Sequence, residues 1–443
     1  MKVLLVNPAW DVSRPGTRRY HRAWPPLDLL VAASLLRSRG HEPILLDARA
    51  AGIGVEKIRA EADRADLVLL QSTPIDRWQC PDLDWEALRD LALKLPGEKT
   101  VLAGAHGTVR PEFMLSKTRV AAAIRGEPEI ALAELAQSGG DPRGVPGLSY
   151  FYAGRVVHEP DRAPAGLDAL PPPAYDLVDL DSYRYELLGP RLALLETSRG
   201  CPFSCDFCLK AMYGRGVRRK PLDMVLAEVE EVVGRRGARN VYFIDLEFTL
   251  RRDYTRNLCL ELMRLNLDFR WCCQTRADTV DHYLLELMKA AGCELIHFGV
   301  ETGSSRLLDT IHKRESLGQV RDAVNWCRRL GLTTACFFLF GLPGETGADR
   351  SAAIRLAREL NPTFCSFHVA APYPGTKMGQ LAGEKEPFPA CLDREHDLAD
   401  LARQTRRAFM AFYLRPGYIW ARLREGTWPD KLNRLKLFWE FIR

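Results

Sequence analysis

The chain has 443 residues, of which 47% are hydrophobic and 27% are charged. These values are typical of a folded protein with two or three domains. The formal net charge of +5 is too small for a dedicated nucleic-acid-binding protein.

Targeting and membrane signals are weak throughout the sequence. No apolar run is long enough to span a bilayer. The first residues, "MKVLLVNPAWD", enter a strand-like run without the longer apolar core of a signal peptide. We therefore expect a cytoplasmic protein without an integral membrane segment.

The first 140 residues alternate between strand and helix patterns and are predicted to form one domain. "LDLLVAASLLRSRG" (27–40) is the clearest helical pattern. Strand–helix alternation with fully apolar strands predicts an α/β fold, in which a doubly wound parallel sheet is covered on both faces. The strand candidates are 2–8, 42–48, 67–73, 100–106 and 121–127.

Ligands of such sheets bind at the carboxyl ends of the strands. Small and polar residues lie there in this chain, and they are candidates for ligand contacts. They are Asn7, Asp47, Gln71, Ser72, Thr73, Gly104, His106, Gly126 and Glu127.

Residues 141–190 are predicted to connect two domains. The segment "VPGLSYFYAGRVVHEP" has the pattern of a small hairpin. The three prolines at 171–173 can continue neither a helix nor a central strand.

Strand–helix alternation resumes at residue 191 and continues to residue 385. Six strand–helix units predict a partial (β/α)6 TIM-like barrel, with its chemistry at the carboxyl ends of the strands. The strand candidates are 191–197, 240–245, 269–275, 294–301, 334–341 and 364–370.

Residues 386–443 have a helical pattern that is rich in arginine and aromatic residues. Leu432, Leu435, Phe438 and Ile442 recur at helical spacing near the end of the chain. A helix that packs on the core or covers a substrate fits this pattern, and weak contact with a membrane surface is the alternative.

The cysteines are not arranged as a disulfide framework. Seven of the twelve lie in apolar stretches and are expected to be buried free thiols: Cys259, Cys272, Cys273, Cys293, Cys327, Cys336 and Cys365.

Cys201, Cys205 and Cys208 form a C-x3-C-x2-C pattern in a loop after the first barrel strand. A structural zinc site requires four ligands, and no second pair of cysteines is near. Soft thiolates also bind iron–sulfur clusters. A four-iron cluster held by three thiolates leaves one iron open to a chelating substrate.

This loop at this place in a partial barrel resembles the radical S-adenosylmethionine (SAM) superfamily. The resemblance implies a [4Fe-4S] cluster on Cys201, Cys205 and Cys208 that cleaves SAM to methionine and a 5′-deoxyadenosyl radical. It also implies that Phe207, in the aromatic position before the third cysteine, lies near the adenine.

Further matches imply SAM contacts at other strand ends. Asp245 and Glu247, in "YFIDLEFT", match residues that approach the methionine amino group. Glu301 and Ser304, in "FGVETGSSRLLDTI", match contacts to the ribose or amino group and to the carboxylate. Arg276 could hold a carboxylate. The alternatives are a capped loop for the first pair, a helix N-cap for Ser304 and a surface ion pair for Arg276.

The first domain resembles the cobalamin-binding domain that precedes some radical SAM barrels. Matching pieces include "VLLVNP", "VLAGAHGTVRPE" and "IRGEPEIALAEL". The D-x-H-x-x-G motif that supplies a histidine to cobalt is not found, and neither His41 nor His106 fits it. Arg77 or Trp78 could cover the lower face of cobalt instead. The other implied contacts are Asn7, Gln71, Ser72, Thr73, Gly104, His106, Gly126 and Glu127. The alternative is a flavodoxin-like domain that binds nothing.

Together the two resemblances imply a cobalamin-dependent radical SAM methyltransferase. Such an enzyme abstracts hydrogen from an unactivated carbon and transfers a methyl group to it from methylcobalamin. A cobalamin-dependent cyclase or rearrangement enzyme is the second hypothesis, and a non-catalytic cobalamin or redox sensor is the third. The expected partners are a small-molecule or natural-product substrate and a flavodoxin or ferredoxin as electron donor. We expect a monomer, with the connector, the loop 9–26 and the C-terminal tail as lids.

Overall fold

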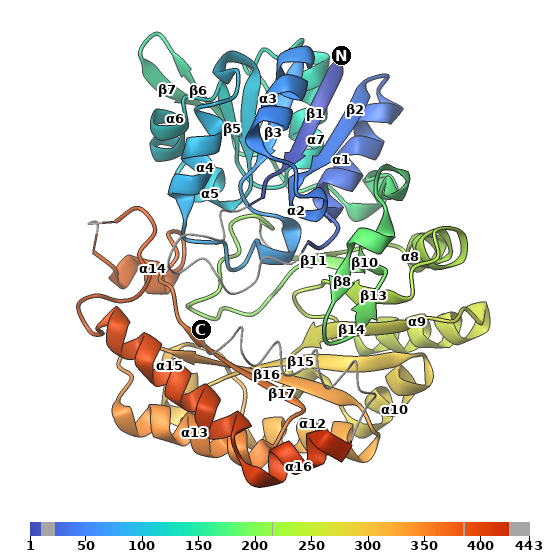
Figure 1. Ribbon diagram of the computed structural model, residues 1–443, viewed down its shortest axis with the longest axis vertical. Coiled ribbons are helices and arrows are strands. Elements are labelled where there is room, and N and C mark those ends of the chain that lie inside the picture. The colour runs from blue at the N-terminus through green and yellow to red at the C-terminus, as the bar shows by residue number, and fades with distance from the viewer. Residues whose placement is uncertain (10–22, 215, 384–385, 425–443) are drawn as a thin grey trace.

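The computed structural model describes residues 1–9, 23–214, 216–383 and 386–424. Two sheets lie one above the other, with the connector and the three-cysteine segment between them (Figure 1). Most of the predicted lid at 9–26 lies outside the described residues. So does the end of the predicted tail helix, with Leu432, Leu435, Phe438 and Ile442.

The N-terminal sheet has seven strands in the order β2-β1-β3-β4-β5-β6-β7. The first five are parallel, as predicted, while β6 and β7 are antiparallel to their neighbours. The predicted hairpin therefore belongs to this sheet, which extends past residue 140. The strands are β1 (Lys2–Asn7), β2 (Glu42–Asp47), β3 (Leu67–Gln71), β4 (Thr100–Ala103), β5 (Ala122–Ile124), β6 (Leu148–Tyr152) and β7 (Arg155–His158).

Helices cover both faces of the N-terminal sheet. Val3 and Leu5 pack with residues of α1 and α7 on one face. Leu4 and Val6 pack with α3, α4 and α6 on the other. This alternation is the side-chain period of a strand that is buried on both sides. The helices are α1 (Leu27–Ser38), α2 (Ala48–Ala51), α3 (Val55–Arg64), α4 (Trp85–Ala92), α5 (Ala105–Val109), α6 (Pro111–Thr118) and α7 (Pro128–Gln137).

The connector after β7 contacts both domains through buried tyrosines. The Tyr175 hydroxyl accepts a hydrogen bond from the backbone N–H of Leu194 at 2.9 Å. The Tyr183 hydroxyl donates to Asp47 at 2.8 Å. Short 3-10 turns and a two-stranded ribbon, β8 (Arg184–Tyr185) with β9 (Gly189–Pro190), fill the segment. The connector is therefore hydrogen-bonded to the last residue of β2 and to β10.

The second sheet has six parallel strands in the order β10-β13-β14-β15-β16-β17. All six match predicted strands. They are β10 (Leu192–Leu195), β13 (Asn240–Phe243), β14 (Arg270–Thr275), β15 (Cys293–Glu301), β16 (Thr333–Phe340) and β17 (Phe364–Val369).

Helices between these strands cover the outer side of the second sheet, and α12 and α13 lie on the side away from the N-terminal domain (Figure 1). The seven cysteines predicted as buried free thiols are buried and unpaired. The helices are α8 (Leu222–Val229), α9 (Arg252–Leu265), α10 (His282–Ala290), α11 (Ser305–Thr310), α12 (Leu317–Arg329), α13 (Gly347–Leu360), α14 (Lys377–Leu381), α15 (Leu398–Tyr413) and α16 (Pro416–Arg424). In the described part of the chain, no helix has the length and apolar character needed to cross a membrane.

Candidate functional site

The three-cysteine loop, residues 201–208, lies between two short paired strands that follow β10. Strand β11 (Ser198–Gly200) pairs antiparallel with β12 (Val217–Arg219). Gly200 has a φ of +94°, and a Cβ there would collide with the carbonyl oxygen of Gly216. Only glycine suits this close crossing, which directs the chain into Cys201.

Asp245 holds the segment that leads into the loop. Its buried carboxylate accepts hydrogen bonds from the Thr197 N–H at 2.9 Å, the Thr197 hydroxyl at 2.6 Å and the Ser198 hydroxyl at 2.6 Å. Burial raises the pKa of Asp245. Asp245 was predicted to contact SAM. In the structure, both of its carboxylate oxygens accept hydrogen bonds from Thr197 and Ser198, just before Cys201.

Asp206, between the second and third cysteines, ties the loop to the barrel. Its carboxylate lies 2.9 Å from Nδ1 of His312 and 3.3 Å from Nζ of Lys377. Its N–H donates to the carbonyl oxygen of Ile311 at 3.1 Å. The loop is therefore held at both its start and its middle.

The thiols of Cys201, Cys205 and Cys208 are free and half-buried. Burial raises all three pKa values. Burial and the charges of the other two thiolates together raise the pKa of Cys208 to about 12. Lys210 opposes these shifts at each thiol. Without a metal the protonated form is favoured, so metal binding here would release protons.

This donor set fits a multi-iron cluster. Within the described residues, no three His, Cys, Asp or Glu side chains lie close enough together to hold a single metal ion. Thiolates that bind separate corners of a cluster do not have to converge on one point. Soft sulfur ligands in a glycine-bounded loop are the ligands that iron–sulfur clusters use.

Glu247 follows β13 and lies beside the end of β14. Its carboxylate accepts from the Arg276 N–H at 3.0 and 3.1 Å and from the Thr279 hydroxyl at 2.9 Å, and the Thr275 hydroxyl also donates to it. Burial raises the pKa of Glu247. It lies where the sequence predicted a SAM contact, and neutral donors already surround it.

Glu301, at the end of β15, has a φ of +66°, which is rare for a residue with a side chain. The register between β15 and β16 shifts at this point. The Glu301 carboxylate lies 2.9 Å from Nζ of Lys313. A Cβ at Gly299 would collide with this carboxylate and would lie 3.0 Å from the same Nζ. The strained backbone and the glycine together make room for a buried ion pair, and such strain is common at functional sites.

Lys313 is almost fully buried and holds several groups together. Nζ also donates to the carbonyl oxygen of Gly299 at 2.9 Å and lies 3.7 Å from Glu315. Burial lowers the pKa of Lys313, but Glu301 and Glu315 outweigh this effect and raise it. The positive charge also lowers the pKa of Cys205. Lys313 therefore links the predicted SAM contact Glu301 to the three-cysteine loop.

Arg276 makes a two-bond pair with Asp278, with Nε and a terminal nitrogen each 2.7 Å from a carboxylate oxygen. Its guanidinium lies 3.9 Å from the ring centre of Phe203 in the three-cysteine loop. The structure therefore shows the ion pair that the sequence offered as the alternative for Arg276, but this pair is largely buried and does not lie on the surface.

The two remaining predicted SAM contacts lie near the same loop. Ser304 is the N-cap residue of α11, which was the predicted alternative to a SAM contact. Its side chain makes no capping hydrogen bond. Phe207 is half-buried and packs against the small apolar cluster that includes Ile311, Leu342 and Met378.

At the carboxyl edge of the N-terminal sheet, four buried polar residues have atoms without hydrogen-bond partners. Asn7 donates to Asp47 at 3.0 Å, and Gln71 donates to Asp28 at 2.6 Å. The Asn7 Oδ1, Asp28 Oδ1, Gln71 Oε1 and Ser72 Oγ atoms have no hydrogen-bond partner among the described residues. Unpaired buried polar atoms are costly, so a ligand with hydrogen-bond donors would be stabilised at this edge.

The other predicted contacts on this edge are tied to the protein itself. His106 is buried, with Nδ1 3.2 Å from the Thr73 hydroxyl and Nε2 2.7 Å from the carbonyl oxygen of Asp82. Burial lowers the pKa of His106. Gly104 has a φ of +112°, and a Cβ there would lie 2.6 Å from Ser72 Oγ and 2.7 Å from the Thr73 nitrogen. This glycine lets the two strand ends approach each other.

The last predicted cobalamin contacts lie at the boundary with the barrel. Arg77 is half-buried beside Asp76, at 3.9 Å, and Trp78 is fully buried. The N–H of Gly126 donates to Thr108 at 3.0 Å. Glu127 pairs with Arg199 and Arg218 of the strand pair that precedes and follows the loop.

The three-cysteine loop and strands β13 to β16 of the second sheet match a known superfamily. Residues 195–357 match the radical SAM superfamily. This stretch begins at the end of β10 and includes the loop, Glu247 and Glu301. Residues 195–357 are a radical SAM domain.

The likeness to curated relatives extends beyond the radical SAM domain. An uncharacterized methyltransferase of Pyrococcus horikoshii is 29% identical over 438 residues, which cover 94% of this chain and 93% of the relative. The anaerobic magnesium-protoporphyrin IX monomethyl ester cyclase of Rubrivivax gelatinosus is 26% identical, over 93% of this chain and 78% of the cyclase.

Two solved structures share the fold of both sheets. The radical SAM methyltransferase TsrM from Kitasatospora setae, with cobalamin and a [4Fe-4S] cluster bound, has a TM-score of 0.68 at 23% identity; the match covers 85% of this chain and 74% of TsrM. The cobalamin-dependent SAM radical enzyme OxsB, with aqua-cobalamin and SAM bound, has a TM-score of 0.75 at 16% identity. That match covers 99% of this chain and 70% of OxsB.

Sequence reasoning missed three charged residues around the radical SAM domain and its partner sheet. Lys313, Arg199 and Asp28 are each buried. A buried lysine or arginine requires carboxylate partners, and the partners Glu127, Glu129 and Glu301 lie on other elements of the fold. The local signals were Glu196, three residues before Arg199, and Glu315, two residues after Lys313.

Proposed function

We propose that the protein is a cobalamin-dependent radical SAM methyltransferase that methylates an unactivated carbon of a small molecule. The observation that carries the proposal is the three-cysteine loop of the radical SAM domain, held against a second α/β domain. The extended likeness to a methyltransferase of P. horikoshii supports it, as does the fold shared with TsrM and OxsB.

In this proposal Cys201, Cys205 and Cys208 hold a [4Fe-4S] cluster, and the N-terminal sheet edge holds cobalamin. When bound, the cluster supplies an open iron and an electron for SAM cleavage, and cobalamin supplies the methyl group. The orphaned oxygen atoms of Asn7, Gln71 and Ser72 suit a ligand that is rich in amide donors. These are the residues that we expect cobalamin to contact first.

The remaining side chains orient SAM. Glu301 and Glu247 would accept hydrogen bonds from its ammonium group, and Phe207 would pack beside its adenine. Lys313 would keep the Glu301 carboxylate in one orientation through its 2.9 Å contact. Asp245 and Asp206 would act one step further away, because they hold the loop.

Anaerobic reconstitution with iron, sulfide and hydroxocobalamin, followed by reduction with SAM present, tests the proposal. A methyltransferase that works in this way would use two molecules of SAM. One would donate its methyl group and leave S-adenosylhomocysteine, and the other would be cleaved and yield 5′-deoxyadenosine. We expect Ala at Cys201, Cys205 or Cys208 to abolish iron binding and SAM cleavage and to leave cobalamin bound. Cys259→Ala, at a buried thiol in α9, is the matched control and should retain the cluster. Zinc in the wild-type site, or a cluster that survives the three substitutions, would contradict the proposal.

The second candidate is a radical cyclase or rearrangement enzyme with the same cofactors. It is favoured by the 26% identity to the cyclase of R. gelatinosus, which spans 93% of this chain. With the true substrate, such an enzyme would form 5′-deoxyadenosine without S-adenosylhomocysteine. The ratio of the two products therefore separates the candidates.

A further inference from the structure

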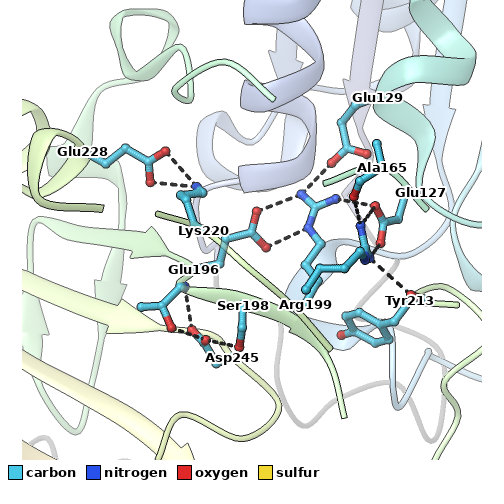
Figure 2. A network of polar contacts seen from close by, with 12 residues as sticks. Glu127, Glu129, Ala165, Glu196, Ser198, Arg199, Tyr213, Lys220, Glu228 and Asp245 are labelled. Atoms are coloured by element: carbon cyan, nitrogen blue, oxygen red, sulfur yellow. Dashed lines mark hydrogen bonds and ion pairs between the residues drawn. The ribbon is translucent and has the colours of Figure 1, made fainter. Parts of the chain in front are cut away.

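A buried ionic network lies directly before the three-cysteine loop (Figure 2). At its centre is Arg199, only 1% exposed. Its guanidinium donates to Glu196 at 2.8 and 2.9 Å, to Glu129 at 2.7 Å and to Glu127 at 3.0 Å. An arginine offers a planar set of donors that suits several carboxylates at once.

The network joins two domains. Glu127 and Glu129 belong to the start of α7 in the N-terminal domain, whereas Glu196 and Arg199 belong to the radical SAM domain. Glu127 also accepts from Arg218 on β12, whose side chain bonds to the carbonyl oxygens of Ala165 and Tyr213. One carboxylate of the N-terminal domain thus holds both strands of the β11–β12 pair.

Aromatic contacts reinforce the same junction. The Arg199 guanidinium lies 5.5 Å from the ring centre of Trp78, a distance at which a cation is attracted to an aromatic face. Trp78 donates through Nε1 to the carbonyl oxygen of Thr73 at 3.2 Å. Its ring packs edge-on against Tyr213 at 5.4 Å, and the Tyr213 hydroxyl donates to Gln79 at 3.2 Å. The N-terminal domain therefore contacts the chain both before and after the three cysteines, at Arg199 and at Tyr213.

We propose that Glu127 and Glu129 are positioning residues for the three-cysteine loop. Through Arg199 and Arg218 they fix the β11–β12 pair, and with it the path of the chain into Cys201. The domain that we propose to carry cobalamin thereby sets the position of the loop that we propose to carry the cluster. This inference deepens the proposed function and rests on it only for the identity of the two cofactors.

A second buried ion pair provides the matched control. Nζ of Lys220 lies 2.8 and 2.9 Å from the Glu228 carboxylate, and both side chains are buried. Lys220 directly follows β12, and its N–H donates to the carbonyl oxygen of Thr197 at 2.8 Å. This pair lies beside the same strands but entirely within the radical SAM domain. Glu228→Gln removes a buried charge without touching the domain junction.

Hydrogen exchange of the full chain, without added cofactors, tests the inference directly. In Glu127→Gln, we expect amides in residues 196–214 to exchange about tenfold faster, because local opening becomes easier. Peptides from β15 should keep the wild-type rate. Glu129→Gln should act in the same direction, and Glu127→Asp should restore most of the protection. Glu228→Gln should leave residues 196–214 close to wild type.

Cofactor loading gives a second readout. After reconstitution, Glu127→Gln should bind less iron, or give an altered electron paramagnetic resonance signal with SAM, while cobalamin stays bound.

Loss of cobalamin with unchanged exchange in residues 196–214 would overturn the inference, because Glu127 would then be a cofactor contact alone. The same acceleration in Glu228→Gln would also overturn it. If Glu127→Gln does not fold, Glu129→Gln decides. A wild-type protein that binds no cluster would refute the proposed function but leave the exchange test valid.

Discussion

The carboxyl edges of the two sheets differ in how far the protein satisfies its own polar groups. At the edge of the radical SAM domain, Asp245, Glu247 and Glu301 each accept bonds from donors within the chain. At the edge of the N-terminal sheet, the Gln71 Oε1 and Ser72 Oγ atoms are among four buried oxygens that have no hydrogen-bond partner in the described part of the chain.

The polar groups of a ligand-binding site can be hydrogen-bonded within the protein before the ligand arrives, or they can gain their partners only from the ligand. Groups that are fully bonded before a ligand arrives hold their orientation, and little is lost when the ligand binds. Orphaned groups cost about 1–3 kcal/mol each, and a ligand that supplies donors recovers that free energy. The radical SAM domain is thus arranged in advance, whereas the N-terminal edge would be completed by the cofactor that we propose it binds.

The largest expected effect on stability comes from removing the Lys313 charge, which pairs with Glu301 at the carboxyl edge of the radical SAM domain. Lys313→Met leaves the Glu301 carboxylate buried without its cation, and such a loss costs about 3–5 kcal/mol of unfolding free energy. SAM affinity should fall as well, because Glu301 loses its fixed orientation. Urea unfolding and SAM binding to the reconstituted protein measure the two effects.

A double substitution separates charge from packing at this site. Lys313→Met with Glu301→Gln removes both charges of that pair but leaves Glu315, 3.7 Å from Nζ in the wild type, without its cation. The double variant should therefore recover part of the lost stability but none of the SAM affinity. A single Lys313→Met variant as stable as wild type would show that the pair is not coupled, and the contrast between the edges would fail.

The sequence predicted the strands of both sheets and the place of the three cysteines, because strand periodicity and the cysteine spacing are local patterns. It could not predict the partners of buried charges. Glu301 was predicted as a SAM contact from its motif, but the pairing of Lys313 with it depends on a bulge in β15. Glu127 was assigned to cobalamin because it follows a strand, and its pairing with Arg199 joins residues 72 positions apart. The hairpin was recognised, but its pairing with β5 is a tertiary contact.

A second effect is opposite pH dependence in the two domains. Burial, with help from Glu129, raises the pKa of Asp28 from 3.8 to about 8. The folded N-terminal domain therefore holds an extra proton between these values, so its stability falls as pH rises through this window. Burial lowers the pKa of His297, which lies 3.0 Å from the Tyr185 hydroxyl and 3.1 Å from that of Tyr242, from 6.5 to about 3. Stability from His297 is present above pH 6.5 and is lost as pH falls toward 3.

Each slope is about 1.4 kcal/mol per pH unit, and the two have opposite signs between about pH 4 and 6.5. Asp28→Asn should make the protein more stable at pH 8 and more sensitive to acid between pH 6.5 and 5. His297→Gln should do the reverse. Urea unfolding at pH 5, 6 and 8 measures both, and parallel pH profiles for the two variants and wild type would contradict these assignments.

The smallest effect is expected at Ser72, where the contrast between the edges is sharpest. Its hydroxyl is buried and has no partner among residues 1–9, 23–214, 216–383 and 386–424. Ser72→Ala should therefore leave the cofactor-free protein as stable as wild type or about 1 kcal/mol more stable. The same change should weaken hydroxocobalamin binding roughly three- to tenfold, because one hydrogen bond to the ligand is lost. Ser149, on β6 of the same sheet, is the matched control, since its hydroxyl lies 2.8 Å from Nδ1 of His158. Ser149→Ala should destabilise the cofactor-free protein and leave cobalamin affinity unchanged. If Ser72→Ala instead behaves like Ser149→Ala, the Ser72 hydroxyl already has a partner within the protein, and the N-terminal edge is as complete as that of the radical SAM domain.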